Sequence, residues 1–268
     1  PLGDAVHRRM MRDFRLYMLV GGMPKAVAEY IRTNNLGAVD LIKRDIVSLY
    51  EEDFMKLDDT GRATALYDAI PAQLSKNASR YRIASAIPGE KADRVTSVVK
   101  MMNDCMAANV VYHSNDPNVG LALTMDNERF KIYASDTGMF VTLAFKDKDF
   151  TDNIIYEKLL NDKLRTNLGY VYENVIAQML RATGKQLFYH TIPTSDGKKY
   201  YEIDFLIADE YKVSPIEVKS SGYKSHTSLD VFCTKFSDRV RNKYIIYTKD
   251  LKREQGIDYI PVYMTMFL

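Results

Sequence analysis

This sequence has few cysteines, no tryptophan and little net charge. It has two cysteines, Cys105 and Cys233, in separate regions, and no pair with the Cys-x-x-Cys spacing of a zinc site. Two isolated cysteines do not build a disulfide framework, which is typical of a protein from a reducing compartment. The net charge is only +2. Such a balance neither requires nor excludes nucleic acid as a partner, so any basic surface must be local.

Long apolar runs and targeting patterns are also missing. No segment approaches the roughly 20 apolar residues that a membrane helix needs, and no signal-peptide pattern precedes the first helical segment. We therefore expect no membrane partner and a cytoplasmic location. The 268 residues suit one large domain or two ordinary ones. Because the chain begins Pro-Leu-Gly without methionine, it resembles a cleaved fragment of a longer protein.

Helical periodicity dominates the first part of the chain. Apolar residues recur at spacings near 3.6 in three successive segments, and Gly21-Gly22 followed by Pro24 separates the first segment from the second. The predicted helices span residues 5–20, 24–33 and 37–56. We interpret this region as a helical packing layer.

A winged helix is predicted over about residues 61–135. Its pattern is a helix, a short helical turn, a long amphipathic helix and a β-hairpin, in that order. The long helix at 91–109 would be the recognition helix, with Lys91, Arg94 and Lys100 available to DNA phosphates. The alternative is a winged helix that packs or contacts protein without touching DNA. The other predicted segments are helices at 61–76 and 81–87 and strands at 110–112 and 130–133.

A change from helical to strand periodicity indicates a domain boundary near residue 150. Residues 146–168 are polar with a helical apolar pattern, and we interpret them as a connector. The prediction is a helical and winged-helix domain at residues 1–150 and an α/β domain at residues 151–268. Within the second domain the order is helix, three strands, helix, strand. The helices are predicted at 169–183 and 228–238 and the strands at 186–190, 200–208, 213–220 and 243–248.

Two neighbouring strands of the second domain carry charged residues at alternate positions. Glu202 and Asp204 are predicted to share one face of the first strand, because side chains alternate between the faces of a sheet. The other face is predicted to carry the apolar residues Ile203, Phe205 and Ile207. By the same alternation Glu217 and Lys219 share one face of the second strand.

The relative position of these two strands depends on the turn between them. If Glu210 and Tyr211 form that turn, Asp204 lies opposite Glu217 and the charged faces coincide. A slip of one residue would place the two acidic sets on opposite faces of the sheet. The simplest turn therefore predicts one cluster of charged side chains.

The clustered side chains suit the chemistry of a metal-dependent hydrolase. Asp204 and Glu217 offer the carboxylate oxygens that Mg²⁺ or Mn²⁺ prefers, and the helix at 169–183 would add Glu173 as an outer ligand. Lys219 would orient the attacking water or neutralise the charge that develops on a phosphodiester. We predict all four residues as catalytic, and the three carboxylates as metal ligands. The alternative is a salt-bridged hairpin surface with no metal.

A helix glutamate followed by a Glu-x-Asp strand and a Glu-x-Lys strand resembles the constellation of PD-(D/E)XK nucleases. The resemblance implies a restriction-endonuclease-like mixed sheet flanked by helices. The predicted fold class is therefore a two-part α+β and α/β chain, with a helical and winged-helix region before the nuclease-like domain.

Most of the chain also resembles the C-terminal region of prokaryotic AAA-type ATPases, which carries a domain of unknown function. The segments that carry this resemblance are Gly-Gly-Met-Pro at 21–24, Lys-Arg-Asp-Ile at 43–46, Lys-Ile-Tyr-Ala-Ser-Asp-Thr-Gly-Met at 131–139, Tyr-Glu-Asn at 172–174, Glu-Ile-Asp-Phe at 202–205 and Ile-Glu-Val-Lys at 216–219. It implies an ATPase core that precedes residue 1, and no settled activity. Since no Gly-x-x-x-x-Gly-Lys-Ser/Thr phosphate loop occurs, ATP is expected only in that missing N-terminal domain.

Three classes of function remain open on this sequence. The first is a divalent-metal-dependent DNA nuclease that works within the larger ATPase. The second is a regulatory module of the ATPase that holds nucleic acid or a partner on a degenerate nuclease fold. Its candidate basic surface consists of Lys198, Lys199, Lys224, Lys235, Arg239 and Arg241. The third is an interaction protein without nucleic acid. The expected partners are DNA and the N-terminal ATPase domain.

Overall fold

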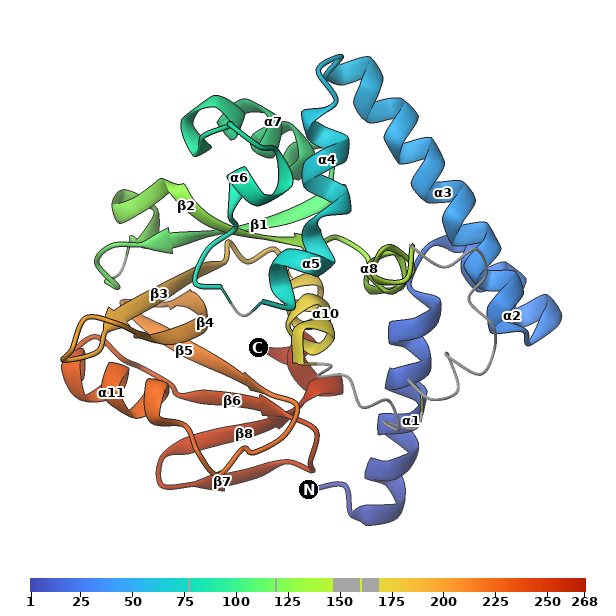
Figure 1. Cartoon of the computed structure of the whole chain (residues 1–268). Helices are drawn as coiled ribbons and strands as arrows, with labels where there is room; N and C mark the ends of the chain where they lie inside the picture. Colours follow the sequence, from blue (N-terminus) through green and yellow to red (C-terminus); the bar gives the residue numbers. More distant parts are fainter. Residues whose placement is uncertain (77, 119, 147–159, 161–168) are drawn as a thin grey trace.

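The chain begins with a series of helices, and helices also cover a mixed β-sheet of eight strands (Figure 1). The strand order in this sheet is β2-β1-β3-β4-β5-β6-β8-β7. The computed structural model describes residues 1–76, 78–118, 120–146, 160 and 169–268. The helices are α1 (Asp4–Val20), α2 (Pro24–Thr33), α3 (Leu36–Leu57), α4 (Arg62–Asp68), α5 (Ile70–Leu74), α6 (Ile83–Ala86), α7 (Ala92–Asp104), α8 (Thr137–Ala144), α10 (Gly169–Ala182) and α11 (Thr227–Lys235), with 3-10 helices η1 (Leu121–Thr124) and η2 (Val262–Phe267). The strands are β1 (Ala108–Ser114), β2 (Met125–Ala134), β3 (Phe188–Pro193), β4 (Tyr200–Asp209), β5 (Lys212–Lys219), β6 (Tyr244–Tyr247), β7 (Lys252–Glu254) and β8 (Ile257–Pro261). A helical region followed by a mixed sheet with helices is thus confirmed at this level.

The first three helices lie where the sequence predicts them. α1 ends at Gly21, whose φ of 82° is a left-handed conformation that glycine adopts without strain. Pro24 occupies the first turn of α2, where its missing amide hydrogen costs nothing. The Asn35 side chain caps α3 by accepting from the amides of Gly37 and Ala38.

The next predicted helices are shorter than expected. Pro71 has no amide hydrogen and its ring excludes the preceding helical turn, so the predicted helix at 61–76 is divided into α4 and α5. The predicted helix at 91–109 ends at Asp104, because Met106 takes a left-handed conformation with φ 58°. The chain then turns directly into β1.

The hairpin of the predicted winged helix is part of the main sheet. β1 pairs antiparallel with β2 on one side and parallel with β3 on the other, where Tyr112 lies opposite Phe188. The sheet therefore crosses the predicted boundary near residue 150, and one hydrophobic core contains buried residues from both sides of it. Because β1 is paired on both sides, the hairpin is not a free wing. Strand pairing between distant segments has no local sequence signal, so the sequence did not predict the pairing of β1 with β3.

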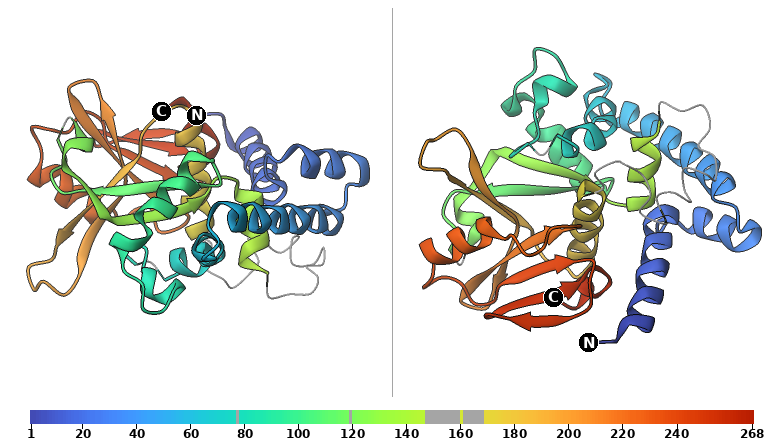
Figure 2. Two further views of the ribbon diagram at one scale, coloured as in Figure 1. Left: turned by 90° about the horizontal axis from the view of Figure 1, so that it is seen from above. Right: turned by 60° about the horizontal axis from the view of Figure 1, so that its bottom comes forward.

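Helices cover both faces of the sheet. α10 packs on one face, and both views of Figure 2 place it between the sheet and helices α1–α3. Val175 and Ile176 of α10 are fully buried in this core. α11 packs on the other face, where Leu229 and Phe232 are fully buried in a second core cluster with residues of β3, β4, β5, β6 and β8.

The pairing of β4 with β5 has the predicted register. The pairs run from Asp209–Lys212 to Phe205–Ile216, so the two residues of the turn are those expected. This prediction is confirmed. It matters for the site, because the register decides whether the charged side chains of the two strands face one another.

β4 carries an irregularity that its alternating pattern does not reveal. Phe188 of β3 pairs with Leu206, but His190 pairs with Ile203, so β4 has one residue more than β3 in this stretch. As a result Ile203 packs in the core cluster of α11, whereas Phe205 packs in that of α10. The prediction that the apolar residues of this strand share one face is therefore wrong.

One predicted segment cannot be compared with the structure, and some observed segments were not predicted. The connector predicted at 146–168 lies outside the described residues, apart from Lys146 and Leu160. β7, β8 and η2 were not predicted, and β8 lies between β6 and β7 in the sheet. In the described part of the chain, no helix has the length and apolar character to cross a membrane.

A buried group of polar contacts, here called the junction, joins α1, α3 and α8. The junction consists of Leu19, Gly22, Lys43, Asp136, Gly138 and Met139. Asp136 Oδ1 accepts from the amide of Met139 at 2.9 Å and so caps α8. Asp136 Oδ2 accepts from the amide of Gly22 at 2.6 Å. Both oxygens of this buried carboxylate therefore have partners.

Lys43 is the cation of the junction. Its side chain is fully buried, and Nζ donates to the carbonyl oxygens of Leu19 at 2.8 Å and Gly138 at 3.1 Å. A Cβ on Gly138 would lie 2.6 Å from the carbonyl oxygen of Val20, so only glycine lets α8 approach α1 this closely. The junction fixes the helical region against the elements that carry the sheet.

Candidate functional site

The predicted catalytic residues line one cleft of about 610 Å³, here called the acidic cleft. Residues of β4 and β5 line it, and we call these strands its floor. The segment between α5 and α6 and the β3–β4 hairpin also contribute lining residues, and we call these two segments its walls. The lining residues are Leu74, Lys76, Ala78, Ser79, Arg82, Lys131, Glu173, Lys198, Lys199, Tyr200, Glu202, Asp204, Glu217, Val218, Lys219 and Ser228. The structure thus brings Glu173, Asp204, Glu217 and Lys219 to one place. Their catalytic role stays a prediction.

Glu217 and Lys219 lie two residues apart on β5 and contact each other. Lys219 Nζ lies 2.7 Å from Glu217 Oε1. Glu217 is only 5% exposed, and its Oε2 has no hydrogen-bond partner among the described residues. A buried carboxylate oxygen without a partner has lost its hydration without compensation. A hydrogen-bond donor or cation bound to Glu217 Oε2 would therefore compensate for this lost hydration.

Asp204 lies at the irregular point of β4, where the described ladder with β5 stops. Its Oδ2 accepts a hydrogen bond from the backbone amide of Val218 at 2.7 Å. Burial raises the pKa of Asp204 well above its usual range, and the nearby carboxylate of Glu173 raises it further, while Lys131 opposes the rise. Asp204 is thus an acidic group close to other negative charge.

Glu173 reaches the cleft from α10, whose neighbouring residues Tyr172 and Asn174 are buried. The hydroxyl of Tyr133 on β2 donates to Glu173 Oε2 over a long 3.5 Å. Burial raises the pKa of the Glu173 carboxyl; Lys131 lowers it and Glu202 raises it. We call the four side chains Glu173, Glu202, Asp204 and Glu217 the acidic cluster.

Lys131 is a residue of the cleft that the sequence analysis missed. It comes from β2, is 5% exposed and forms an ion pair with Glu202. Burial disfavours its charge, but the surrounding acidic groups, Glu202 first, raise the pKa of Lys131 well above its usual range. Its signal was a lysine within a largely apolar stretch of strand. That signal could not be used, because 71 positions separate it from Glu202.

The rim of the cleft is basic. Lys76 and Arg82 lie on the wall between α5 and α6, and Lys198 and Lys199 lie on the β3–β4 hairpin. We call these four the rim cations. All are exposed, and none of them forms an ion pair with a carboxylate that the structure describes. Cations that no neighbour neutralises are available to phosphate groups.

Lys198 and Lys199, two of the basic residues predicted for a binding surface, line the cleft, whereas the other predicted basic residues lie outside it. Lys91, Arg94 and Lys100 are exposed at or on α7. Lys224 and Lys235 are exposed before and at the end of α11. None of the five lines the acidic cleft. Their contact with DNA stays a prediction.

The donor groups of the cleft can be compared with the needs of Mg²⁺ or Mn²⁺. Among the described residues no three His, Cys, Asp or Glu side chains are gathered to hold one ion. Mg²⁺, however, usually takes one or two carboxylates and completes its shell with water and substrate phosphate. Asp204 and Glu217, which has an unpartnered oxygen, supply these two carboxylates. The residues suit an ion whose coordination shell is completed by water and substrate. They do not suit an ion that is held by protein ligands alone.

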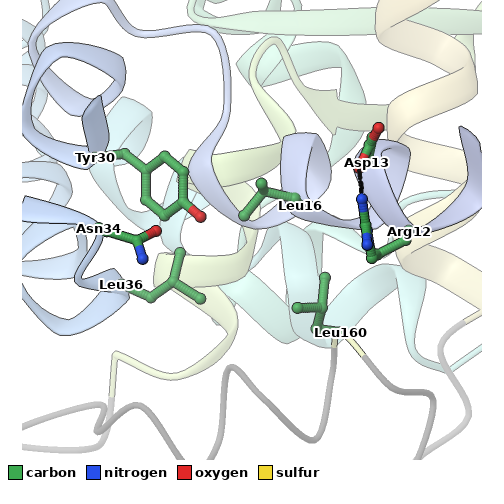
Figure 3. A pocket seen from close by; sticks show the side chains of 7 residues that line it. All are labelled: Arg12, Asp13, Leu16, Tyr30, Asn34, Leu36 and Leu160. Atoms are coloured by element: carbon green, nitrogen blue, oxygen red, sulfur yellow. Dashed lines mark hydrogen bonds and ion pairs between the residues drawn. The ribbon is translucent and has the colours of Figure 1, made fainter. Parts of the chain in front are cut away.

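A second pocket, of about 380 Å³, lies among α1, α2 and α3 (Figure 3). It is lined by Arg12, Asp13, Leu16, Tyr30, Asn34, Leu36 and Leu160. Arg12 Nε and Nη2 each lie 3.2 Å from Asp13 Oδ1, so the charges of this pocket are paired with each other. Unlike the acidic cleft, its described lining offers no unpartnered buried charge.

Comparison with known families gives two matches. Residues 11–149, more than half of the chain, match the model of a domain of unknown function, DUF8612. The chain belongs to the DUF8612 family. Residues 168–265 match a second domain of unknown function, DUF4143, a family of C-terminal domains in ATPase-associated proteins, which supports the predicted resemblance at that level. No curated protein and no solved structure matches the chain significantly.

The acidic cleft is built from both matched regions. Lys76, Arg82 and Lys131 belong to the DUF8612 region, whereas the other charged residues of the cleft belong to the DUF4143 region. The gap between the two matches lies beside the predicted boundary near residue 150, although the sheet continues across it. The cleft is therefore complete only when both regions fold together.

Proposed function

We propose that the acidic cleft hydrolyses phosphodiester bonds of nucleic acid with a divalent cation, on a PD-(D/E)XK-like fold. One observation carries the proposal. One buried carboxylate with an unpartnered oxygen and three partly buried carboxylates lie in the same cleft as exposed cations without a described partner. A salt-bridged surface would pair these groups with each other. A phosphodiester site needs both, carboxylates for the metal and cations for the nucleic-acid backbone.

The residues of the cleft divide the proposed work among them. Asp204 and Glu217 would hold Mg²⁺ or Mn²⁺, with Glu173 as an outer ligand. Such an ion polarises a phosphodiester and lowers the pKa of a bound water. Lys219 lies 2.7 Å from Glu217 and is placed to neutralise charge that develops on the phosphate. Lys131 pairs with Glu202, so Glu202 is not counted among the metal ligands.

A second function, binding without cleavage, is favoured by the two lysines of the cleft. Lys131 and Lys219 each pair with a carboxylate of the acidic cluster, so the cluster is partly neutralised without any metal. The rim cations would then hold a polyanion over a degenerate nuclease site. For both functions, the DUF4143 match supports a role as the C-terminal module of an AAA-type ATPase, which would be its partner.

Cleavage assays separate the two functions. The chain is incubated with Mn²⁺ and labelled single-stranded DNA, duplex DNA or RNA. We expect cleavage of at least one substrate, and its loss in EDTA. Lys219→Met should slow cleavage by about 10²–10³, the usual effect of losing one electrostatic group at a reacting phosphate or carbonyl. Lys212→Met, an exposed lysine on the same strand, is the matched control and should cleave like the unchanged chain.

Two outcomes contradict the nuclease proposal. One is the absence of cleavage of every substrate in both Mn²⁺ and Mg²⁺. The other is equal cleavage by the Lys219→Met and Lys212→Met variants, which would show that the activity does not come from this cleft. Retained binding without cleavage would favour the second function.

A further inference from the structure

We infer that the acidic cleft takes a single strand of nucleic acid, as a strand end or an everted nucleotide, and that Tyr200 stacks on one of its bases. The inference rests on the proposed function, because it names the substrate of the same cleft. Three features of the cleft support it: the burial of its acidic groups, the position of its cations and the exposure of one aromatic ring.

The acidic groups lie too deep for an intact duplex. Glu217 is 5% exposed, and Asp204 and Glu173 are partly buried, so a reacting phosphate must come down to the floor. A cleft of about 610 Å³ falls in the range that encloses a small organic ligand. That space suits one or two nucleotide units. Enzymes with such sites act on single strands or on nucleotides that are turned out of the helix.

The cations stand on both walls of this cleft. Lys76 and Arg82 lie on one wall and Lys198 and Lys199 on the other. A single backbone that passes between the walls contacts both sets, and a groove of this kind follows the backbone without reading sequence. A duplex that lies across the rim would leave the floor unreached.

Tyr200 is the exposed aromatic residue of the cleft. It is 52% exposed and follows directly on Lys198 and Lys199. Tyr200 and Glu202 are two residues apart on β4, so they lie on one face and about 7 Å apart along the strand. The ring therefore stands beside the acidic floor. Basic residues next to an exposed aromatic ring are typical of single-strand binding sites, where bases stack on the ring.

The hairpin that carries these residues is held in a fixed shape. Thr194 N donates to the carbonyl oxygen of Lys199 at 2.9 Å, and the amide of Lys198 donates to Asp196 Oδ1 at 3.1 Å. Gly197 has a φ of 67°, which the turn requires. Tyr200 is therefore positioned before a ligand arrives, and stacking on it orders little additional chain.

Fluorescence anisotropy in EDTA tests this inference without any cleavage. The probes are a labelled deoxythymidine oligomer, a uridine oligomer of equal length and a DNA duplex of equal length. We expect at least one single strand to bind about tenfold or more tighter than the duplex. Tyr200→Ala should weaken single-strand binding by about 5- to 100-fold, the usual effect of losing one stacked ring. Tyr200→Phe keeps the ring and should bind normally.

Tyr211 provides the matched control. It is 88% exposed at the β4–β5 turn and does not line the cleft, so Tyr211→Ala should leave binding unchanged. Equal or tighter binding of the duplex, or unchanged single-strand binding by Tyr200→Ala, would overturn the inference. Tighter binding of either oligomer than of the duplex supports the inference, and the oligomer that binds more tightly identifies DNA or RNA as the substrate. If the chain binds single strands but never cleaves them, the nuclease proposal fails and the single-strand inference stands.

Discussion

The junction and the acidic cluster both bury charge, but they treat it in opposite ways. In the junction each oxygen of Asp136 accepts a backbone amide, and Lys43 donates to two backbone carbonyls. In the acidic cluster, burial and neighbouring carboxylates raise the pKa of Glu173 and of Asp204, and Glu217 Oε2 has no partner among the described residues. The same kinds of side chain are hydrogen-bonded to backbone groups in one place and only partly partnered in the other.

The difference separates a structural role from a functional one. Burial lowers the pKa of Lys43 to about 8, so its charge is not free of cost. A buried charge that is hydrogen-bonded to backbone groups nevertheless holds segments together, and its removal leaves those groups without partners. Gathered like charges cost stability, and folds retain them where a ligand or a reaction uses them. The two regions should therefore respond to substitution with opposite signs.

Lys43→Met should have the largest effect on stability. It leaves the carbonyl groups of Leu19 and Gly138 without their donor and removes the cation near Asp40 and Asp136, so we expect a loss of about 3–5 kcal/mol in the free energy of unfolding. Urea denaturation at pH 7 measures it. Lys25→Met, at an exposed position of α2, should change stability by less than about 0.5 kcal/mol. A loss as small as that of the control would show that the junction does not fix the helical region.

Glu173→Gln should act in the opposite direction and more weakly. Because the folded state raises the pKa of Glu173, it keeps a proton at pH values where the unfolded chain has lost it. This carboxyl therefore destabilises the fold increasingly as the pH rises above its unfolded pKa. Glutamine keeps the shape without the charge, so we expect a gain of about 1 kcal/mol at pH 8 and a smaller gain at pH 5.

Denaturation of Glu173→Gln at both pH values checks this prediction. Glu52→Gln, at an exposed helical position on α3, is the matched control and should show no such pH dependence. A loss of stability at pH 8, or a gain that shrinks as the pH rises, would mean that the acidic cluster is satisfied like the junction. The comparison between the two regions would then fail.

Local patterns were enough to predict much of the site. The two-residue turn fixed the register of β4 and β5, and alternation placed Glu217 and Lys219 on one face. Helical periodicity placed Glu173 on a helix that packs against the sheet. These features depend on residues that are close in the sequence, where spacing carries the information.

Features that depend on distant segments could not be predicted. The pairing of β1 with β3 joins the two parts of the chain, and with it Lys131 enters the acidic cleft. The extra residue in β4 moves Ile203 to the opposite face, and alternation alone does not show it. The wall that carries Lys76 and Arg82 likewise reaches the cleft through tertiary packing. Periodicity identifies elements, but it does not say which elements become neighbours.

Mn²⁺ titration followed by electron paramagnetic resonance tests most directly whether the acidic cleft is a metal site. We predict binding at millimolar Mn²⁺ or below, and a loss of at least about tenfold in affinity for Glu217→Gln, which removes a charged ligand. Lys219→Met removes the ammonium that lies 2.7 Å from Glu217, so affinity should hold or rise by up to about tenfold. Opposite effects of the two variants would support the account. No binding by any of the three proteins, or an equal loss in both variants, would contradict it.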